Sequence, residues 1–361
     1  MGDKALAMKG GREKASVFSV LARNWSFFFL VLTVVIFSFT GKNFFALNNF
    51  QSIIHLATTA LLLACAETFV IITGGVDLSV GFVLGLSAVA SASTMQLLYA
   101  AHWSAPASVL VGIVVGIAAS LACGLVAGVM IARFKVPPFI ATLGTMGIAI
   151  GVSYHICGGF PIGYLPPGLT DIGNMYVLYV HPASGAWSFF ARPASIAANQ
   201  IKELVRIAPI SFILIFVFLL LLWHLLKNTR FGQHTYAIGG SMDASVRAGI
   251  NTRRHLILIY VLSTFLAGLA GIVDLFQSGT GNFTTFGAQL ELFAIAAVII
   301  GGASLMGGKG RILASAVGVL LLKVLENGLN LSGVQPFYRY IAVGLILIVA
   351  VVIDQLFPDL F

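Results

Sequence analysis

The sequence predicts an all-α, polytopic membrane protein with about ten transmembrane helices. Hydrophobic residues make up 59% of the 361 residues and charged residues only 9%, whereas soluble domains carry roughly 25% charged residues. Apolar runs close to the roughly 20 residues needed to cross a bilayer recur along most of the chain. So few charges cannot cover the apolar surface of a water-soluble fold.

Ten apolar runs are candidates for spanning helices, and two of them are shorter than a full crossing. They cover residues 25–40, 51–73, 78–98, 105–134, 138–157, 209–226, 254–276, 290–305, 312–325 and 340–356. The runs define a transmembrane domain over residues 25–356, between an N-terminal arm of residues 1–24 and a tail of residues 357–361. Two longer loops interrupt the domain, at residues 158–208 and 227–253.

The positive charges orient these runs. Most of the 20 Lys and Arg residues lie in the N-terminal arm and in alternate loops, including 227–253. Because cytoplasmic loops are enriched in Lys and Arg, we place those loops and both termini in the cytoplasm and residues 158–208 outside. The formal charge of +8 is explained by topology, so no nucleic-acid partner is expected. The first run follows a long basic arm without a small-residue cleavage site, which favours a spanning helix over a cleaved signal peptide.

No enzyme or metal motif stands out. Cys65, Cys123 and Cys157 lie at unrelated spacings in apolar runs, so neither a disulfide nor a metal site is expected. The seven histidines show no metal-ligand spacing. Residues 301–310 (GGASLMGGKG) come close to a phosphate-binding loop but fail the pattern, because Gly310 stands where a hydroxyl is needed for Mg²⁺. We expect no metal and no nucleotide on this chain.

Small and kinking residues mark the boundaries and contacts of several runs. Asp77, after Gly74-Gly75, is suited to cap the third run, and Pro137-Pro138 separates the fourth from the fifth. The fourth run carries a small residue at every fourth position: Gly112, Gly116, Ser120, Gly124 and Gly128. Such a stripe lets helix backbones approach closely in lipid, so we expect this run to be central in the bundle. Residues 197–207 are expected to form a short surface helix.

Acidic residues inside apolar runs are expensive and usually functional. Glu67 lies deep in the second run, and two interpretations stay open: a polar group on a substrate path, or a structural acid paired within the bundle. Asp274, Glu291 and Glu326 lie near run ends, where we expect them to reach interfacial water.

A compact polar segment rich in Gly and Ala separates two runs on the basic side, at residues 236–251. A membrane protein has little reason to keep such a segment unless a soluble partner docks on it. Asp243 and Arg247 lie one turn apart if it is helical, and Ala244, Ala248 and Gly249 allow close approach.

Five stretches, in order, resemble permease subunits of bacterial ABC importers of the ribose/xylose/galactose type. They are residues 73–81 (TGGVDLSVG), 141–146 (ATLGTM), 237–251, 300–310 (IGGASLMGGKG) and 326–331 (ENGLNL). The resemblance covers residues 50–354 and departs from the family in two places. Glu67 stands where members usually carry an apolar residue, and segment 158–208 is longer than expected.

The resemblance implies an inner-membrane permease that pairs with a second permease copy, identical or paralogous. A periplasmic solute-binding protein would deliver a small hydroxylated solute such as a monosaccharide. A separate ABC ATPase subunit would bind ATP and Mg, so this chain would carry no cofactor and no catalytic activity.

The resemblance also assigns roles to residues. The ATPase-coupling residues would be Gly239, Gly240, Asp243, Ala244, Arg247, Ala248, Gly249 and Ile250. The substrate path would include Glu67, Thr68, Thr142 and Thr145. The structural motif would comprise Gly74, Gly75, Asp77, Ser79 and Gly81.

Two other classes of protein remain as alternatives. An ion-coupled secondary transporter would use Glu67 as its carrier site, although the inverted repeats typical of that class are not evident in the sequence. A membrane scaffold or receptor without transport activity is the third possibility.

Overall fold

The computed structural model describes residues 25–193, 196, 200, 203–283 and 289–335, together with 337–338, 341–342, 344–345, 348 and 352. The N-terminal arm, the C-terminal tail and most of the tenth apolar run therefore lie outside the described residues.

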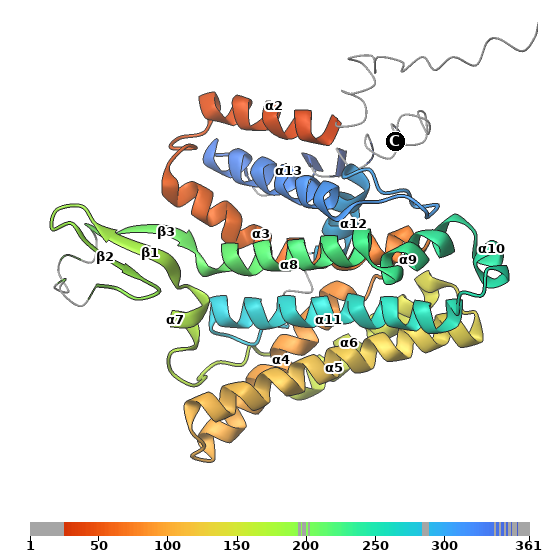
Figure 1. Ribbon diagram of the computed structural model, residues 1–361. Coiled ribbons are helices and arrows are strands. Elements are labelled where there is room, and N and C mark those ends of the chain that lie inside the picture. Colours follow the sequence, from red (N-terminus) through yellow and green to blue (C-terminus); the bar gives the residue numbers. More distant parts are fainter. Residues whose placement is uncertain are drawn as a thin grey trace, which may run out of the picture.

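The described chain is mostly helical, as the sequence predicts (Figure 1). Seven helices are long and apolar enough to cross a membrane, and two shorter apolar helices, α2 and α12, accompany them. In chain order these nine helices are α2 (Trp25–Thr40), α3 (Leu47–Ile72), α4 (Val80–Ala100), α5 (Ala105–Phe134), α6 (Pro138–Cys157), α8 (Ile210–Asn228), α11 (Thr252–Ser278), α12 (Leu290–Ile300) and α13 (Ile312–Leu331).

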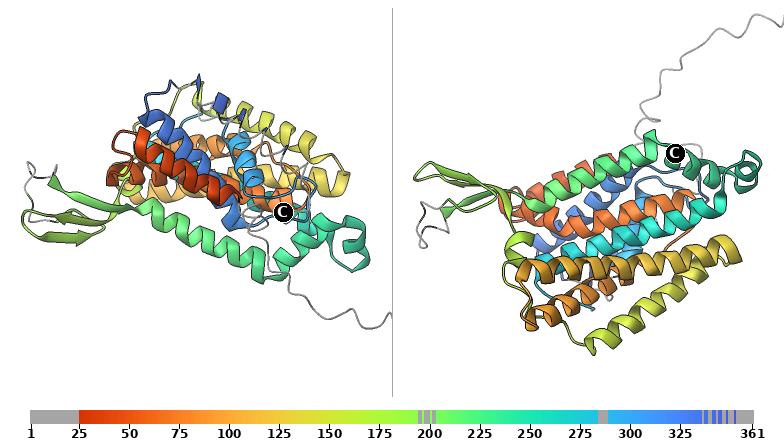
Figure 2. Two further views of the ribbon diagram at one scale, coloured as in Figure 1. Left: turned by 90° about the horizontal axis from the view of Figure 1, so that it is seen from above. Right: turned by 60° about the horizontal axis from the view of Figure 1, so that its bottom comes forward.

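The core is built around α3, α4 and α11. Residues 60–72 of α3 are buried on every face, as is most of residues 83–92 of α4. A helix that is apolar all round is suited to such a position. Figure 2 shows the long helices side by side along one common direction.

Helix α5 packs through its small-residue stripe, as predicted. An added Cβ at Gly124 would lie 2.7 Å from the Tyr260 carbonyl oxygen of α11, and one at Gly116 would lie 2.7 Å from the Ser87 carbonyl oxygen of α4. The expectation that α5 is central is wrong, because its other face is exposed, with Leu110 at 63% and Val114 at 59%. The single stripe provides one packing face, and the opposite face of α5 is exposed on the surface of the bundle.

The boundary between α5 and α6 follows the prediction. Lys135 ends α5 in the left-handed conformation (φ 57°), and Pro138 is the first residue of α6. Proline at the first helical position loses no intrahelical hydrogen bond.

Segment 158–208 contains a small sheet that the sequence did not predict. After the one-turn helix α7 (Leu169–Gly173), strands β1 (Tyr176–His181), β2 (Ala186–Phe189) and β3 (Val205–Pro209) form an antiparallel sheet in the order β2-β1-β3. The expected surface helix over residues 197–207 is wrong where the structure describes it, since Val205 and Ile207 pair with Val180 and Leu178 of β1. Alternating β-branched residues favour this pairing. Residues 197–199 and 201–202 lie outside the described residues.

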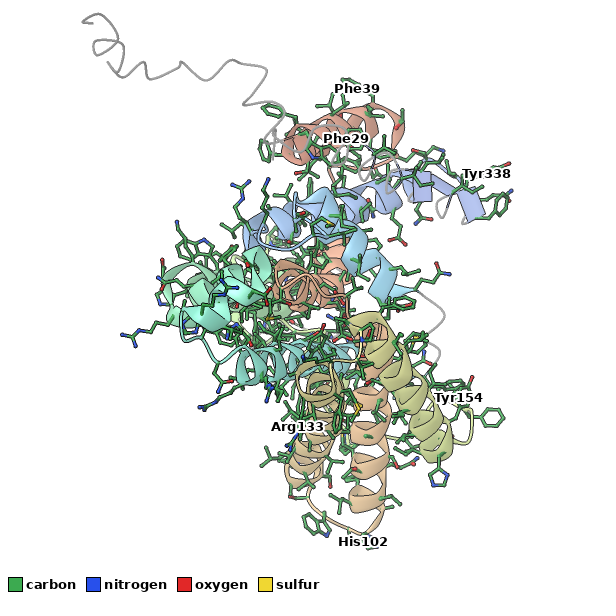
Figure 3. The ribbon with its side chains drawn as sticks, turned by 90° about the vertical axis from the view of Figure 1, so that its right-hand side faces the viewer. Phe29, Phe39, His102, Arg133, Tyr154 and Tyr338 are labelled. Carbon is green, nitrogen blue, oxygen red and sulfur yellow. The ribbon has the colours of Figure 1, made fainter. Side chains whose placement is uncertain are left out.

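The predicted loop 227–253 is largely helical. It contains α9 (Arg230–Gly240) and α10 (Met242–Arg247), and α8 continues to Asn228. Each helix start carries an N-cap: Thr229 accepts from Gly232 N, Ser241 from Ala244 N, and Asn251 from Arg254 N. Helix α10 lies at one end of the molecule and the sheet at the other (Figure 1). Figure 3 looks along the bundle from the α10 end and shows the exposed side chains of Phe39 and Tyr154 pointing away from it.

Candidate functional site

Helix α10 is an exposed element suited to docking. Asp243, Ala244, Arg247 and Ala248 are exposed, and Ser245 is buried beneath them. Gly249 follows with φ 81° and open space around the position of a Cβ. The predicted coupling residues of α10 and its C-terminal turn therefore share one accessible surface, with Ile250 half-buried at its edge.

Gly239 behaves differently from the other predicted coupling residues because it faces the core. An added Cβ there would overlap the Ile72 carbonyl oxygen of α3 and lie 2.6 Å from Gly308 N, whereas Gly240 is exposed with open space around it. Gly239 therefore holds the end of α9, directly before α10, against the bundle.

Gly239 lies where the end of α3, the end of α9 and the loop before α13 come together. Four glycines form this contact, which we call the glycine joint: Gly74, Gly239, Gly307 and Gly308. Gly308 N donates to Ile72 O at 2.8 Å, and Tyr236 Oη of α9 donates to Gly310 O at 2.6 Å. Gly74, Gly307 and Gly308 adopt positive φ values of 79°, 85° and 77°, which glycine accepts readily. The joint ties α9 to the end of α3. In the sequence, residues 307–310 were interpreted only as part of a stretch that does not match a phosphate-binding loop and that resembles the permease family. The three glycines among these four residues were the signal that could have predicted close backbone contact.

A second feature is a buried acidic cluster formed by Glu67 of α3, Asp77 of the α3–α4 connection and Glu291 of α12. Their side chains are 0%, 0% and 7% exposed. Glu67 Oε2 accepts from Asp77 N at 3.4 Å, while Glu67 Oε1 and Glu291 Oε2 have no hydrogen-bond partner among the described residues. The expectation that Glu291 reaches interfacial water is wrong, because its side chain faces Gly81, where any Cβ would overlap Glu291 Oε2. Asp274 and Glu326 are half-buried, and Glu326 pairs with Lys323 at 3.0 Å.

Asp77 organises the turn before α4 and ties it to α11. Its Oδ1 accepts from Ser79 N at 3.0 Å and Ser79 Oγ at 2.6 Å, and its Oδ2 accepts from Ser263 Oγ at 2.8 Å. Asp77 thus precedes α4 by one turn and is not its N-cap, which is Ser79. Gly75 is required beside it, since a Cβ there would overlap Tyr260 Oη.

The predicted substrate-path residues lie in two buried places. Thr68 Oγ1 donates to Ala64 O at 2.6 Å and lies 2.8 Å from Ser315 Oγ, next to Glu67 of the acidic cluster on α3. Thr142 and Thr145 of α6 donate to Pro138 O and Ala141 O of their own helix, at 2.9 and 3.0 Å. All three side chains are at most 2% exposed, so these hydroxyls are closed off from solvent in this conformation. Among the described residues, no group of His, Cys, Asp or Glu side chains could hold a metal ion.

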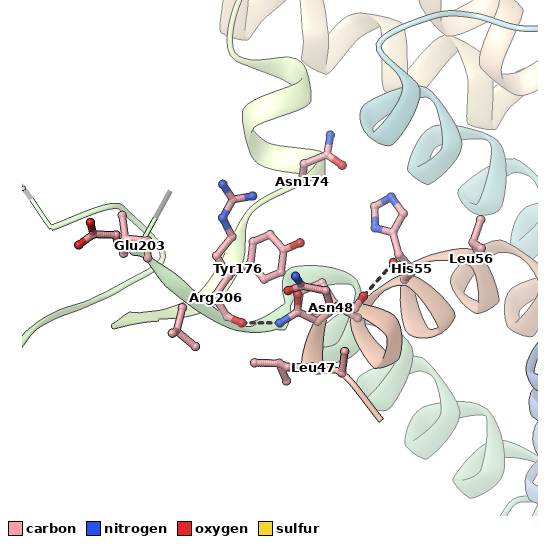
Figure 4. Close-up of a pocket in the computed structure, with 14 residues that line it drawn as sticks. Leu47, Asn48, His55, Leu56, Asn174, Tyr176, Glu203 and Arg206 are labelled. Atoms are coloured by element: carbon pink, nitrogen blue, oxygen red, sulfur yellow. Dashed lines mark hydrogen bonds between the residues drawn. The ribbon is translucent and has the colours of Figure 1, made fainter. Parts of the chain in front are cut away.

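A polar pocket of about 870 Å³ lies at the sheet end, between the start of α3 and strands β1 and β3 (Figure 4). Gln51 Nε2 donates to Arg206 O, and the Arg206 guanidinium lies 5.7 Å from the centre of the Tyr176 ring. Asn48, His55, Asn174 and Glu203 add polar groups to the wall. No sequence signal pointed to this pocket, because it depends on the sheet.

Seven helices that are long and apolar enough to cross a membrane, packed around a buried core, define a multi-pass membrane protein. The chain belongs to the family described as the branched-chain amino acid transport system / permease component, whose model matches residues 49–351.

Its relatives include several import permeases aligned over nearly their whole length. The chain is 35% identical to the ribose import permease protein of Bacillus subtilis (strain 168), over 93% of this chain and 94% of that one. It is 31% identical to the ribose import permease protein of Haemophilus influenzae, over 96% and 98% of the two chains, and 33% identical to the galactose/methyl galactoside import permease protein of the same species, over 95% and 97%. No solved structure matches the chain.

These comparisons confirm the resemblance drawn from the five sequence stretches: the chain is a transport permease subunit and a multi-pass membrane protein. They give no support to the ion-coupled alternative that would use Glu67 as a carrier site.

Proposed function

We propose that this chain is the inner-membrane permease subunit of an ATP-driven bacterial importer of monosaccharides. The observation that carries the proposal is near full-length similarity to permeases named for ribose and for galactose and methyl galactoside. A D-allose transport system permease protein of Escherichia coli (strain K12), 32% identical over 92% of this chain, adds a third sugar. The proposed solute is accordingly a small hydroxylated sugar.

In this proposal a separate ABC ATPase supplies the energy and docks on α10. The exposed surface of Asp243, Ala244, Arg247 and Ala248 supports docking, and the glycine joint would carry its movement to α3. The glycine-rich stretch 301–310 is engaged in packing, since Gly308 N already donates to Ile72 O. That engagement supports a non-catalytic role in which ATP and Mg are bound by the partner.

A second permease copy, identical or paralogous, would complete the transport path. Helix α6 presents Gly144, Gly147 and Gly151 on a face with nothing within 4 Å of any of their Cβ positions. Small residues at this spacing favour close helix contact in lipid. We therefore place the second copy against α6.

The solute path in this proposal passes Thr142 and Thr145, on the buried face of α6 that is turned away from Gly144, Gly147 and Gly151, and reaches Glu67 and Thr68 when the bundle opens. A carboxylate and hydroxyls suit the hydrogen-bonding groups of a sugar. With α10 and both termini in the cytoplasm, the sheet and its 870 Å³ pocket face the periplasm, where a solute-binding protein would dock.

The test begins with purification of the tagged protein from its host membranes and identification of its partners by mass spectrometry. A stoichiometric soluble ATPase is expected. The complex is then reconstituted in vesicles with the companion binding protein, and ATP-dependent uptake of labelled ribose, galactose and allose is measured, with a labelled branched-chain amino acid as the control solute. A chain that purifies alone after mild crosslinking, or uptake of the amino acid only, would contradict the proposal.

A further inference from the structure

A second pocket, of about 560 Å³, lies at the α10 end of the bundle, between α2, α8 and the start of α13. It shares no lining residue with the polar pocket at the sheet end and none with the acidic cluster. It is lined by residues from the start of α2, the end of α8 and the start of α13, together with Tyr236 of α9 and Gly301.

The pocket combines two cations with apolar walls. Lys227, in the last turn of α8, and Arg311, directly before α13, both line it, and both residues are exposed. Neither forms an ion pair among the described residues. The apolar wall is formed by Phe27, Leu226, Ile312, Leu313, Ala314 and Val317.

The position of the pocket along the helices matches the headgroup level of a bilayer. Lys227 lies at the end of one spanning helix and Arg311 at the start of another. Trp223 lies one turn before Lys227, whose Nζ is 5.1 Å from the centre of its ring. Tryptophan and lysine in this arrangement are typical of the membrane interface. Phe27 of α2 and Leu313 of α13, 51% and 50% exposed, add accessible apolar surface beside the two cations.

We propose that this pocket binds one anionic phospholipid of the adjacent leaflet, with its phosphate held by Lys227 and Arg311 and its acyl chains along Phe27 and Leu313. Basic pockets between transmembrane helices on the cytoplasmic side are suited to acidic headgroups. The start of α13 also presents the positive end of a helix dipole to this pocket. A zwitterionic headgroup fits less well, because its own cation would meet Lys227 and Arg311.

The bound lipid would fill the groove between α2 and α8 beside the glycine joint. Tyr236 links the two features, since its ring lines the pocket while its hydroxyl donates to Gly310 O at 2.6 Å. Occupancy would hold α9 against the bundle without contacting the docking surface of α10.

Native mass spectrometry of the delipidated protein in detergent tests this inference, with phosphatidylglycerol and phosphatidylcholine added separately. The wild type is expected to retain one phosphatidylglycerol per chain and to bind phosphatidylcholine at least about tenfold more weakly. Each basic residue near an anionic surface contributes roughly 1 kcal/mol, so Lys227→Gln/Arg311→Gln is expected to weaken phosphatidylglycerol retention by about tenfold or more. The matched control is Arg253→Gln/Arg254→Gln, which removes two exposed cations of the α11 start that do not line the pocket.

Further variants separate the lipid from other occupants. Ala314→Phe fills the pocket without changing charge and is expected to weaken retention even if the double glutamine variant does not fold. Asp354→Asn/Asp359→Asn, in the acidic C-terminal residues, is expected to leave retention unchanged. The proposal is overturned if the pocket variants retain as much phosphatidylglycerol as the control, or if inorganic phosphate at equal concentration displaces the lipid. It is also overturned if neutralising the acidic C-terminal residues raises phosphatidylglycerol retention, since those residues would then be the occupant.

Discussion

Helices α5 and α6 carry the same sequence signal and use it differently. Both have small residues at helical spacing, but the stripe of α5 is filled by α4 and α11, while Gly144, Gly147 and Gly151 of α6 meet open space. The same contrast recurs at the docking element, where Gly239 is packed against α3 and Gly249 is open. Small residues at helical spacing therefore allow close contact, and only the fold decides whether they are packed within the chain or left exposed on its surface.

Gly124→Leu is expected to have the largest effect. A Cβ at this position would overlap Thr264 Oγ1 and lie 2.7 Å from the Tyr260 carbonyl oxygen and 2.9 Å from Val261 Cα, so backbone would have to move. Overpacking of this kind costs roughly 1–3 kcal/mol and sometimes more, and we expect loss of folded protein in detergent, measured by yield and thermal unfolding. Gly147→Leu on α6 is the matched control. Equal losses of folded protein in the two variants would contradict the difference between the packed glycines of α5 and the exposed glycines of α6.

Gly249→Trp and Asp243→Lys are expected to leave the protein folded and abolish recovery of its ATPase. Both positions are exposed on the α10 surface, so neither side chain enters the core, and the backbone strain of a tryptophan at the φ of 81° of Gly249 falls on the exposed turn after α10. Co-purification from host membranes measures the effect, with Gly239→Leu as the contrasting variant that disrupts the glycine joint and lowers folded yield. Recovery of the ATPase at wild-type yield by either surface variant would remove α10 from the coupling role.

Gly144→Leu/Gly151→Leu is expected to weaken pairing of the permease copies while changing the free energy of unfolding of a single chain by about 0.5 kcal/mol or less, as for exposed positions. Site-specific crosslinking in membranes reports the paired fraction. The α5 residue Val114, exposed on the face turned away from the stripe of that helix, provides the control Val114→Leu. Unchanged pairing in the glycine variant would place the second copy elsewhere.

Glu67→Gln is expected to have the smallest effect on folding and a clear effect on transport. The substitution keeps the shape of a buried side chain that accepts from Asp77 N, so protein abundance should stay close to wild type. We expect the apparent affinity or maximal rate of solute uptake to change several-fold, and Asp77→Asn gives a structural comparison because Asp77 holds three hydrogen bonds. Normal uptake kinetics in Glu67→Gln would assign Glu67 to the structural role.

Much of the architecture follows from local pattern. The apolar runs predict the spanning helices, Pro137-Pro138 fixes a boundary, and the stripe of α5 predicts a tight contact. These features can be predicted because they depend only on the composition and spacing of residues that are close together in the sequence.

The features that depend on distant pairing were missed. The sheet requires β1 to meet β3 across more than a dozen intervening residues, and the burial of Glu291 requires α12 to face Gly81. Neither long-range contact leaves a local signal, so a strand was interpreted as a surface helix and a buried acid as an interfacial one. The role of each candidate site residue remains a proposal for the experiments above.

Helix α3 connects the two ends of the bundle mechanically. At one end Ile72 O accepts from Gly308 N in the glycine joint, and at the other Gln51 Nε2 donates to Arg206 O in the three-stranded sheet. Twenty-six residues without a break form a strut of about 40 Å. A rotation applied by a partner at the α10 end would therefore be transmitted along α3 to the pocket at the sheet end, because the helix has no break at which it could bend.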